Sequence, residues 1–351
     1  MTIKVSGYAA ERAKAPLTPY HFERREPRAD DVLIDILYCG VCHSDLHHVN
    51  ADWNTTYPVV PGHEIIGKVI SVGNSVSHFK EGDYVGVGCM VDSCQHCNPC
   101  KQGLEQYCDE GMTPTYNGAD RHDHMPTYGG YSDKIVVSEK FVLKIPQGLD
   151  LKSAAPLLCA GITTWSPLRH WNVKQGSRVA VVGLGGLGHM AIKLAKGLGA
   201  QVTLFTRSPS KEQDALDLGA DKIILSTDAK QMAAAKGEFD LIIDTVPYEH
   251  DINPYVTTLT INGTLVLVGF LGDLQPTINS AALVLGRKTV AGSVIGGIAE
   301  TQEMLDFCGK HGITADVEMI NMQDIDNAFK RMLKSDVKYR FVIDMASLKK
   351  S

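Results

Sequence analysis

The residues best suited to chemistry are His63 and Glu64, which stand side by side in V-P-G-H-E-I-I-G-K-V-I-S-V-G, residues 60–73. Cys42 precedes them, and Cys159 lies far downstream in an apolar segment. Two thiolates, one imidazole and one carboxylate or water form the mixed ligand set of a catalytic zinc ion, with one position open to substrate. A histidine alone is more often an ordinary surface residue, so the predicted metal site rests on the whole set.

A second group of cysteines has the spacing C-x2-C-x2-C-x7-C and comprises Cys94, Cys97, Cys100 and Cys108. The surrounding loop is polar and offers little core of its own. Four thiolates make a closed tetrahedral zinc site, and closed sites are structural. An iron–sulfur cluster is the main alternative, but the spacing departs from common ferredoxin patterns. Four unconnected thiols are the remaining interpretation.

A glycine-rich segment, G-L-G-G-L-G, follows an apolar run at 178–182 and precedes a helical pattern at 187–198. Glycines here allow a tight turn and a close approach of the backbone to a pyrophosphate at the helix N-terminus. We therefore predict a dinucleotide site that includes Gly183, Gly185, Gly186, Leu187 and Gly188.

The end of the next predicted strand indicates which dinucleotide binds. A carboxylate that grips the adenosine ribose is expected about twenty residues after the glycines in enzymes that use NAD(H). The sequence there is T-R-S-P-S-K, residues 206–211, without an acidic residue. Its cations and hydroxyls suit a phosphate, so Thr206, Arg207, Ser208 and Lys211 predict NADP(H). The alternative interpretation is a solvated helix start.

The elements that position these residues form two patterns. Short apolar runs separated by Gly, Pro and Asp predict a barrel-like β domain up to about residue 149, with strands at 32–38, 65–72, 84–87 and 131–137. After residue 154 strands and helices alternate, which predicts a parallel sheet with helices on both faces. Its strands are expected at 178–182, 201–205, 222–225, 241–245 and 264–269, and one helix at 208–219.

The C-terminal region has a mixed pattern, with helices expected at 300–311 and 324–334 and a strand at 339–344. The simplest architecture returns this tail to the first domain. A chain of 351 residues exceeds what one core usually organises, so two domains are the expectation.

Composition excludes several function classes. A formal charge of −6 gives no basic face for nucleic acid or an anionic membrane. No stretch of eighteen apolar residues and no signal-peptide pattern are present, so we expect a soluble cytoplasmic protein. Nine cysteines, an odd number gathered mostly in one region, suit metal binding in a reducing compartment better than disulfides.

Taken together, these motifs resemble the zinc-dependent medium-chain alcohol dehydrogenases, and within them the cinnamyl alcohol dehydrogenase-like branch. The resemblance spans the chain and includes G-V-C-H-S-D at 40–45, G-H-E at 62–64, L-L-C-A-G-I-T-T at 157–164 and K-Y-R-F-V-I-D at 338–344. It implies an α/β two-domain fold, with a GroES-like β-barrel catalytic domain at 1–155 and 293–351 around an inserted Rossmann NADP-binding domain at 156–292. It also implies a homodimer.

The resemblance assigns roles to single residues. Cys42, His63 and Cys159 would hold the catalytic zinc, with Glu64 a nearby carboxylate able to join the ligands. Ser44 and His47 would form a proton relay, although the hydroxyl in this branch is often Thr, and Asp45 would orient His63. Further cofactor contacts are implied at Thr163, Thr245, Val268, Ser293, Ile295 and Arg340.

We therefore expect a zinc-dependent, NADP(H)-linked oxidoreductase with two zinc ions per chain that interconverts aldehydes and primary alcohols. Aldehyde reduction is expected to be favoured, with aromatic, allylic or a broad range of aldehydes as substrates. Two alternatives stay open. A metal-free quinone or enoyl reductase on the same fold would not need the ligand set, and a non-catalytic, zinc-stabilised NADP-binding protein would not need the relay.

Overall fold

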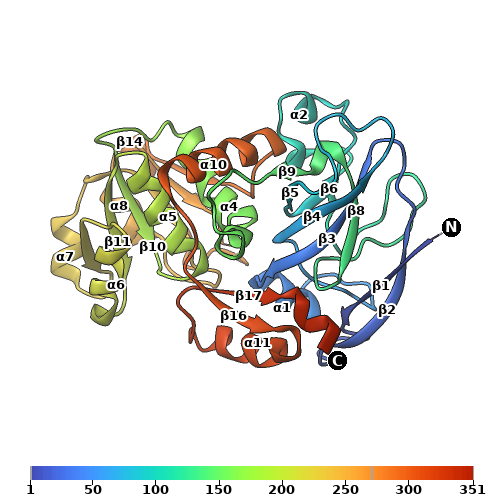
Figure 1. Ribbon diagram of the computed structural model, residues 1–351. Helices are drawn as coiled ribbons and strands as arrows, with labels where there is room; N and C mark the ends of the chain where they lie inside the picture. Colours follow the sequence, from blue (N-terminus) through green and yellow to red (C-terminus); the bar gives the residue numbers. More distant parts are fainter. Residues whose placement is uncertain (1, 270–271, 351) are drawn as a thin grey trace. The chain divides into compact units, whose positions relative to one another are not determined.

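The computed structural model describes residues 2–269 and 272–350, and the chain divides into two compact units (Figure 1). The first contains Met1–Cys159 and Gly296–Ser351, and the second contains Ala160–Ile295. The α/β class predicted from the sequence is confirmed. The predicted domain limits, 1–155 with 293–351 and 156–292, stay a prediction. Two compact units of a chain need not be domains that fold independently.

The first unit is built on a mainly antiparallel sheet with the strand order β16-β17-β3-β4-β5-β9, and β8 also pairs with β3. β17 lies antiparallel to β3, with Val342 opposite Gly40, so the C-terminal tail completes this sheet. The strands of the sheet are β3 (Asp31–Gly40), β4 (Ile65–Val72), β5 (Tyr84–Val87), β8 (Lys134–Ser138), β9 (Leu143–Lys144), β16 (Val317–Asn321) and β17 (Arg340–Asp344). The other elements are β1 (Thr2–Ala9), β2 (Thr18–Arg25), β6 (Met90–Asp92), β7 (Thr113–Pro114), α1 (His43–Asn50), α2 (Asn98–Lys101), α3 (Leu151–Ala154), α10 (Ile298–His311) and α11 (Ile325–Leu333).

The second unit is a parallel sheet with the strand order β12-β11-β10-β13-β14-β15. Chain order reverses between β10 and β13, which is the switch point of a doubly wound sheet, where ligands bind at the carboxyl ends of the strands. The strands are β10 (Arg178–Val182), β11 (Gln201–Thr206), β12 (Lys222–Leu225), β13 (Phe239–Asp244), β14 (Leu259–Leu267) and β15 (Thr289–Gly292). The helices are α4 (Ala160–His170), α5 (Gly186–Gly197), α6 (Glu212–Asp217), α7 (Ala229–Ala234), α8 (Asn253–Thr258) and α9 (Ser280–Val284).

One predicted helix differs in detail. The segment after β11 starts as a 3₁₀ turn, Pro209–Lys211, and only then continues as α6. Ser208 precedes the turn, but its hydroxyl lies 2.8 Å from the Ser210 hydroxyl and caps no backbone N–H. The two serine hydroxyls therefore bond to each other instead of to the backbone. The N-terminus of this helix lacks a side-chain cap, and its first turn has the tighter 3₁₀ geometry.

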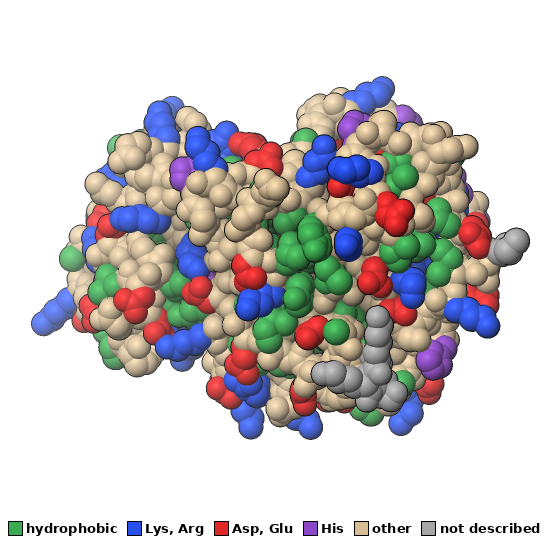
Figure 2. Space-filling model, viewed as in Figure 1, with side chains coloured by type: hydrophobic (Ala, Val, Ile, Leu, Met, Phe, Trp, Pro, Cys, Tyr) green, Lys and Arg blue, Asp and Glu red, His purple; other side chains and the backbone are tan. Residues whose placement is uncertain are grey.

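Charged side chains of both signs are interspersed over the face of the molecule drawn in Figure 2. This distribution agrees with the small formal charge of −6 and shows no large basic area on that face. Among the described helices, none combines the length and the apolar character needed to cross a bilayer.

Candidate active site

Four side chains that are distant in sequence converge in the first unit. Cys42 ends the loop after β3, His63 and Glu64 immediately precede β4, and Cys159 follows a 3₁₀ turn at Ala155–Leu158. Their ligand atoms all lie within 4.8 Å of one another, and all four residues are buried. We call this set the buried cluster.

The buried cluster fits a metal ion. Nε2 of His63 is buried and has no hydrogen-bond partner among the described residues, which is costly unless something else binds it. The sulfurs of Cys42 and Cys159 are 3.9 Å apart. This contact lowers the pKa of the Cys42 thiol and raises that of Cys159, because the protonated Cys159 can donate a hydrogen bond to an ionised Cys42. A cation between them would allow both to ionise, as zinc ligands do.

Asp45 holds the backbone on both sides of this cluster. Its carboxylate accepts hydrogen bonds from the N–H of Cys42 at 2.9 Å, the N–H of Gly62 at 3.0 Å and the hydroxyl of Tyr131 at 3.0 Å. One buried carboxylate thus fixes the segments that carry two ligands. Its negative charge also raises the pKa of His63, together with the charges of Cys89 and Cys42, against the opposing effect of burial.

Glu64 forms an ion pair with Arg340, the first residue of β17. The Glu64 side chain is 0% exposed and that of Arg340 is 6% exposed. Burial raises the pKa of Glu64, while the charge of Arg340 opposes the rise. The other carboxylate oxygen, Oε2, has no hydrogen-bond partner among the described residues, so it is free to meet a cation.

The two residues of the expected relay lie in α1, close to this cluster. The Ser44 hydroxyl is 3.5 Å from the sulfur of Cys42. The His47 ring stacks on Trp53, with 4.8 Å between ring centroids, and its Nδ1 lies 2.9 Å from the Asp52 carboxylate. With its side chain 31% exposed, His47 reaches water. The relay itself stays a prediction.

Sequence analysis missed two neighbours of the buried cluster. Cys89 interacts with Cys159 and with the charge of His63, and the ring of Tyr116 stacks on His63 at 5.6 Å. Cys89 stands only five residues before Cys94, so in the sequence it looks like part of the other cysteine group. Strand β6, Met90–Asp92, lies between Cys89 and Cys94 and carries the chain from one group to the other.

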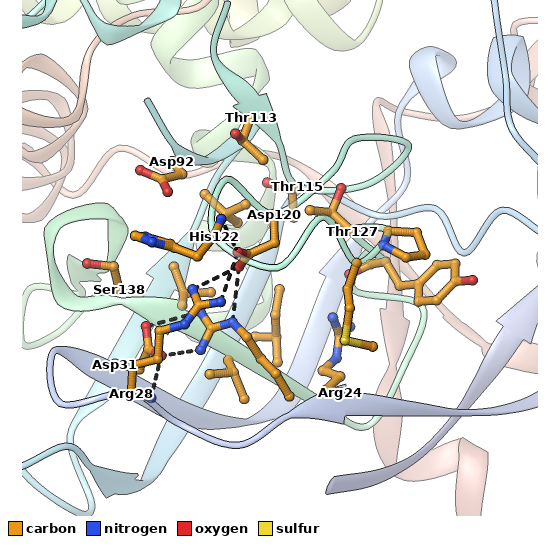
Figure 3. Close-up of a pocket in the computed structure, with 18 of the residues that line it drawn as sticks. Arg24, Arg28, Asp31, Asp92, Thr113, Thr115, Asp120, His122, Thr127 and Ser138 are labelled. Carbon is orange, nitrogen blue, oxygen red and sulfur yellow. Dashed lines mark hydrogen bonds and ion pairs between the residues drawn. The ribbon is translucent and has the colours of Figure 1, made fainter. Parts of the chain in front are cut away.

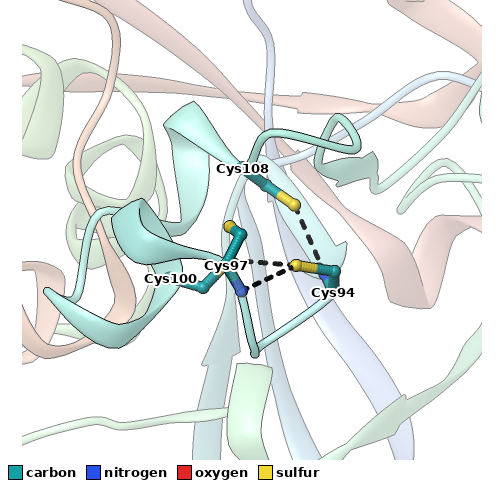
Figure 4. A group of neighbouring side chains, drawn as sticks. All are labelled: Cys94, Cys97, Cys100 and Cys108. Carbon is teal, nitrogen blue, oxygen red and sulfur yellow. Dashed lines mark hydrogen bonds between the residues drawn. The ribbon is translucent and has the colours of Figure 1, made fainter.

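The other cysteine group lies in the loop of residues 94–108, which we call the cysteine lobe (Figure 4). The Cys94 and Cys100 sulfurs are 3.9 Å apart. The N–H groups of Cys97 and Cys94 donate to the sulfurs of Cys94 and Cys108 at 3.3 and 3.4 Å. Ligand atoms of all four lie within 4.8 Å, and backbone donors that face sulfur favour thiolates, so the arrangement fits a tetrathiolate metal site.

Arg121 is a neighbour of the cysteine lobe that the sequence did not reveal. Its Nη2 lies 3.8 Å from the sulfur of Cys108 and also donates to the Gly111 carbonyl, and Nη1 pairs with Glu110 at 3.0 Å. A guanidinium at this position offsets part of the negative charge of four thiolates.

The predicted dinucleotide residues gather at the carboxyl ends of the parallel strands. Gly183 follows β10 with a φ of +89°, and a Cβ on Gly188 would stand 2.1 Å from the Gly183 carbonyl, so both positions require glycine. Gly185, Gly186 and Leu187 open α5. The Thr245 hydroxyl donates to the Val182 carbonyl at 2.7 Å and so ties the end of β13 to the glycine loop.

The remaining predicted cofactor residues lie as follows. Thr206 ends β11 and is buried, and the next residue, Arg207, is exposed. Ser208 precedes the 3₁₀ turn, and Lys211 is its last residue. Val268 and Ser293 follow β14 and β15, Ile295 comes two residues later, and Thr163 is buried in α4. Arg340 belongs to the first unit, where Glu64 is its ion-pair partner. Contact with a cofactor stays a prediction for each of them.

A charged cavity in the first unit is separate from these groups (Figure 3). Arg25 and Arg28 reach across it to the carboxylates of Asp31, Asp120 and Asp123. The charges of these two arginines and three aspartates are thus already paired with one another. We interpret these ion pairs as a clasp between β2 and the 113–128 segment.

Comparison with known proteins places the chain. Residues 28–147 match the family model of the alcohol dehydrogenase GroES-like domain, and residues 186–310 match that of the zinc-binding dehydrogenases. The chain is 52% identical over 349 residues to aldehyde reductase YahK of Escherichia coli (strain K12), covering 99% of both. It belongs to the zinc-type alcohol dehydrogenase family. The family predicted from the motifs is confirmed, and the chain is an oxidoreductase.

Other members of this alcohol dehydrogenase family agree over the full length. NADP-dependent alcohol dehydrogenase C of Mycobacterium tuberculosis is 51% identical, with 98% of this chain and 99% of that protein covered. A cinnamyl alcohol dehydrogenase from Sorghum bicolor superposes with a TM-score of 0.94 at 47% identity, covering 98% of each chain. CAD from Helicobacter pylori, solved with NADP(H), gives a TM-score of 0.92 at 43% identity, covering 99% of each chain.

Proposed function

We propose that the chain reduces aldehydes to primary alcohols with NADPH, using Cys42, His63 and Cys159 to hold a catalytic zinc ion and the cysteine lobe to hold a structural one. The observation that carries this proposal is the buried cluster, with an unpartnered His63 nitrogen beside two close thiols. A zinc ion bound there supplies a Lewis acid that polarises a carbonyl oxygen. The nicotinamide supplies the hydride.

The residues of this chain manage the proton. The overall reaction takes an aldehyde, NADPH and one proton to an alcohol and NADP+, so the substrate oxygen must receive that proton. Ser44, whose hydroxyl lies beside Cys42, is our candidate donor, and His47 connects it to water.

Because oxidation of the alcohol releases a proton, reduction of the aldehyde is favoured at neutral pH. Initial rates in both directions at pH 7 test this, and faster oxidation at saturating NADP+ would contradict it.

Cofactor choice follows from the end of β11. No carboxylate stands between Val202 and Lys211, whereas Arg207 is exposed and able to pair with a 2′-phosphate. Charge-assisted hydrogen bonds contribute about 1.5–3 kcal/mol each, so several together favour NADPH over NADH by ~100-fold or more in kcat/KM. Arg207→Ala should narrow this ratio, and Lys230→Ala on α7 serves as the exposed control in the same unit.

Similar kcat/KM values for NADH and NADPH in the unaltered enzyme would overturn the cofactor assignment.

The names of the relatives, which include cinnamyl alcohol dehydrogenases, lead us to propose aromatic and allylic aldehydes as substrates. A panel of cinnamaldehyde, benzaldehyde and aliphatic aldehydes with NADPH tests that choice. We also propose a homodimer, which light scattering would check.

A further inference from the structure

His250 lies in the loop between β13 and α8. Its Nε2 is 2.8 Å from Oδ2 of Asp244, and its Nδ1 is 2.9 Å from the Tyr248 carbonyl oxygen. A carbonyl and a carboxylate only accept hydrogen bonds, so both ring nitrogens must donate. The geometry therefore holds His250 as an imidazolium.

Its partner, Asp244, is a carboxylate out of contact with water. The Asp244 side chain is 0% exposed, and its Oδ1 accepts the N–H of Val246 at 3.1 Å, which shapes the turn after β13. The contact with Asp244 raises the pKa of His250, against the opposing effect of burial. The buried negative charge thus has His250 as an adjacent cation, and that cation carries a removable proton.

The pair stands beside the glycine loop. Asp244 ends β13 and is the register partner of Val182 on β10, the residue that precedes Gly183. The next residue, Thr245, bonds to the Val182 carbonyl. This place is the carboxyl end of the sheet at its switch point, where a dinucleotide binds. An uncompensated carboxylate there would repel a phosphate-bearing ligand.

We propose that His250 is a positioning residue of the dinucleotide site, which neutralises Asp244 so that this buried carboxylate does not oppose the phosphates of NADP(H). The proposal rests on the proposed cofactor. On this proposal the affinity for NADP(H) depends on the protonation of His250. Protein with a protonated His250 binds the anionic cofactor more tightly, so the affinity falls as pH rises past the pKa of His250.

Other groups around His250 do not titrate in the same way. The Tyr255 ring of α8 lies 6.1 Å away, and burial raises its pKa, so it stays neutral. Asp251 accepts hydrogen bonds from Asn253, and the charge of Arg207 acts on Tyr255. Between pH 7 and 9.5 a cofactor 2′-phosphate is about nine-tenths ionised or more, because its second pKa is near ~6.

The test is the Kd of NADP+, measured by calorimetry from pH 7 to 9.5. In the unaltered protein we expect Kd to rise with pH, by up to ~10-fold per unit for one linked proton. Asp244→Asn should flatten this dependence. At pH 7, where His250 is most protonated, His250→Gln should weaken binding by ~10-fold or more, and Asp244→Asn/His250→Gln should recover the affinity to within ~3-fold, because it removes both charges.

His170→Gln, an exposed histidine in the same unit, is the matched control and should leave Kd unchanged. A flat pH dependence in the unaltered protein, or no recovery in the double variant, overturns the proposal. If His250→Gln does not fold, the pH dependence of the NADP+ Kd in Asp244→Asn still tests the proposal. A slope as steep as that of the unaltered protein would overturn it. Failure of the unaltered protein to bind NADP+ at pH 7 would instead overturn the proposed cofactor, so the two failures are distinguishable.

Discussion

The buried cluster and the cysteine lobe both offer cysteine thiols to a metal ion but are built in opposite ways. The ligands of the buried cluster come from three segments, at 42, 63–64 and 159, and all are buried. Those of the lobe come from one loop, residues 94–108, and Cys94 and Cys97 are only half-buried. On the proposed assignment, the sheet positions the ligands of the buried cluster and a zinc ion there serves chemistry. A zinc ion in the lobe would instead have to organise a loop with little core of its own.

An arginine lies beside each centre, and the arginine of the buried cluster is the more buried of the two. Arg340 is buried and pairs with buried Glu64. Arg121 is 22% exposed and shares its charge between the Cys108 sulfur and Glu110. Burial strengthens electrostatic interactions, so we expect large effects at the buried cluster and small ones at the cysteine lobe.

The largest effect is expected from His63→Ala. If the buried cluster serves chemistry, kcat/KM should fall by ~10³-fold or more, while the thermal midpoint changes little because the sheet still holds the other ligands. Steady-state kinetics and calorimetry measure both quantities. His78→Ala, at an exposed histidine of the same unit, should change neither. A large loss of stability with activity retained would reverse the roles of the two centres.

Arg340→Met tests the buried charge balance. Breaking a buried ion pair by removing one partner typically costs about 3–5 kcal/mol, since the other charge stays uncompensated. We expect the unfolding free energy of the first unit to fall by about this amount in urea titrations. Arg340→Met/Glu64→Gln should recover most of the loss, because no charge is left unpaired. Equal stability of the single and double variants would show that an unpaired Glu64 charge is not what destabilises Arg340→Met.

Cys97→Ser tests whether the metal organises the cysteine lobe. Loss of one of four ligands should reduce zinc from two ions per chain to one and destabilise the lobe locally by about 3 kcal/mol or more. That value corresponds to a ~100-fold faster proteolytic cleavage within residues 94–112. Elemental analysis and timed proteolysis measure these outcomes, with Cys308→Ser as the control outside both centres. Iron in the lobe, or zinc unchanged at two, would refute the assignment.

Local patterns predicted most of what is local. The glycine loop was visible because Gly183 and Gly188 are required by a turn between adjacent elements, and the lobe was visible because its spacing is short. The long-range set of Cys42, His63 and Cys159 was also predicted, from its residue types, but the long-range ion pair of Glu64 was not. Glu64 and Arg340 are 276 residues apart, and only the antiparallel pairing of β17 with β3 brings them together. Cys89 was misleading for the same reason, since its sequence neighbours belong to one centre and its spatial neighbours to the other.

The smallest effect is expected from Arg121→Gln. A zinc ion with four thiolates has a net charge of −2, and a cation 3.8 Å from one sulfur reduces the repulsion among them. Because Arg121 is partly exposed and also pairs with Glu110, solvent screens much of this contribution. We expect zinc release from the lobe to a chromogenic chelator to be ~10-fold faster, with a smaller difference at high salt. Arg12→Gln, an exposed arginine outside the lobe, is the control. If Arg121→Gln releases zinc no faster than Arg12→Gln at low salt, the guanidinium supports the 108–121 segment through the Gly111 carbonyl rather than through charge, and the parallel with Arg340 fails.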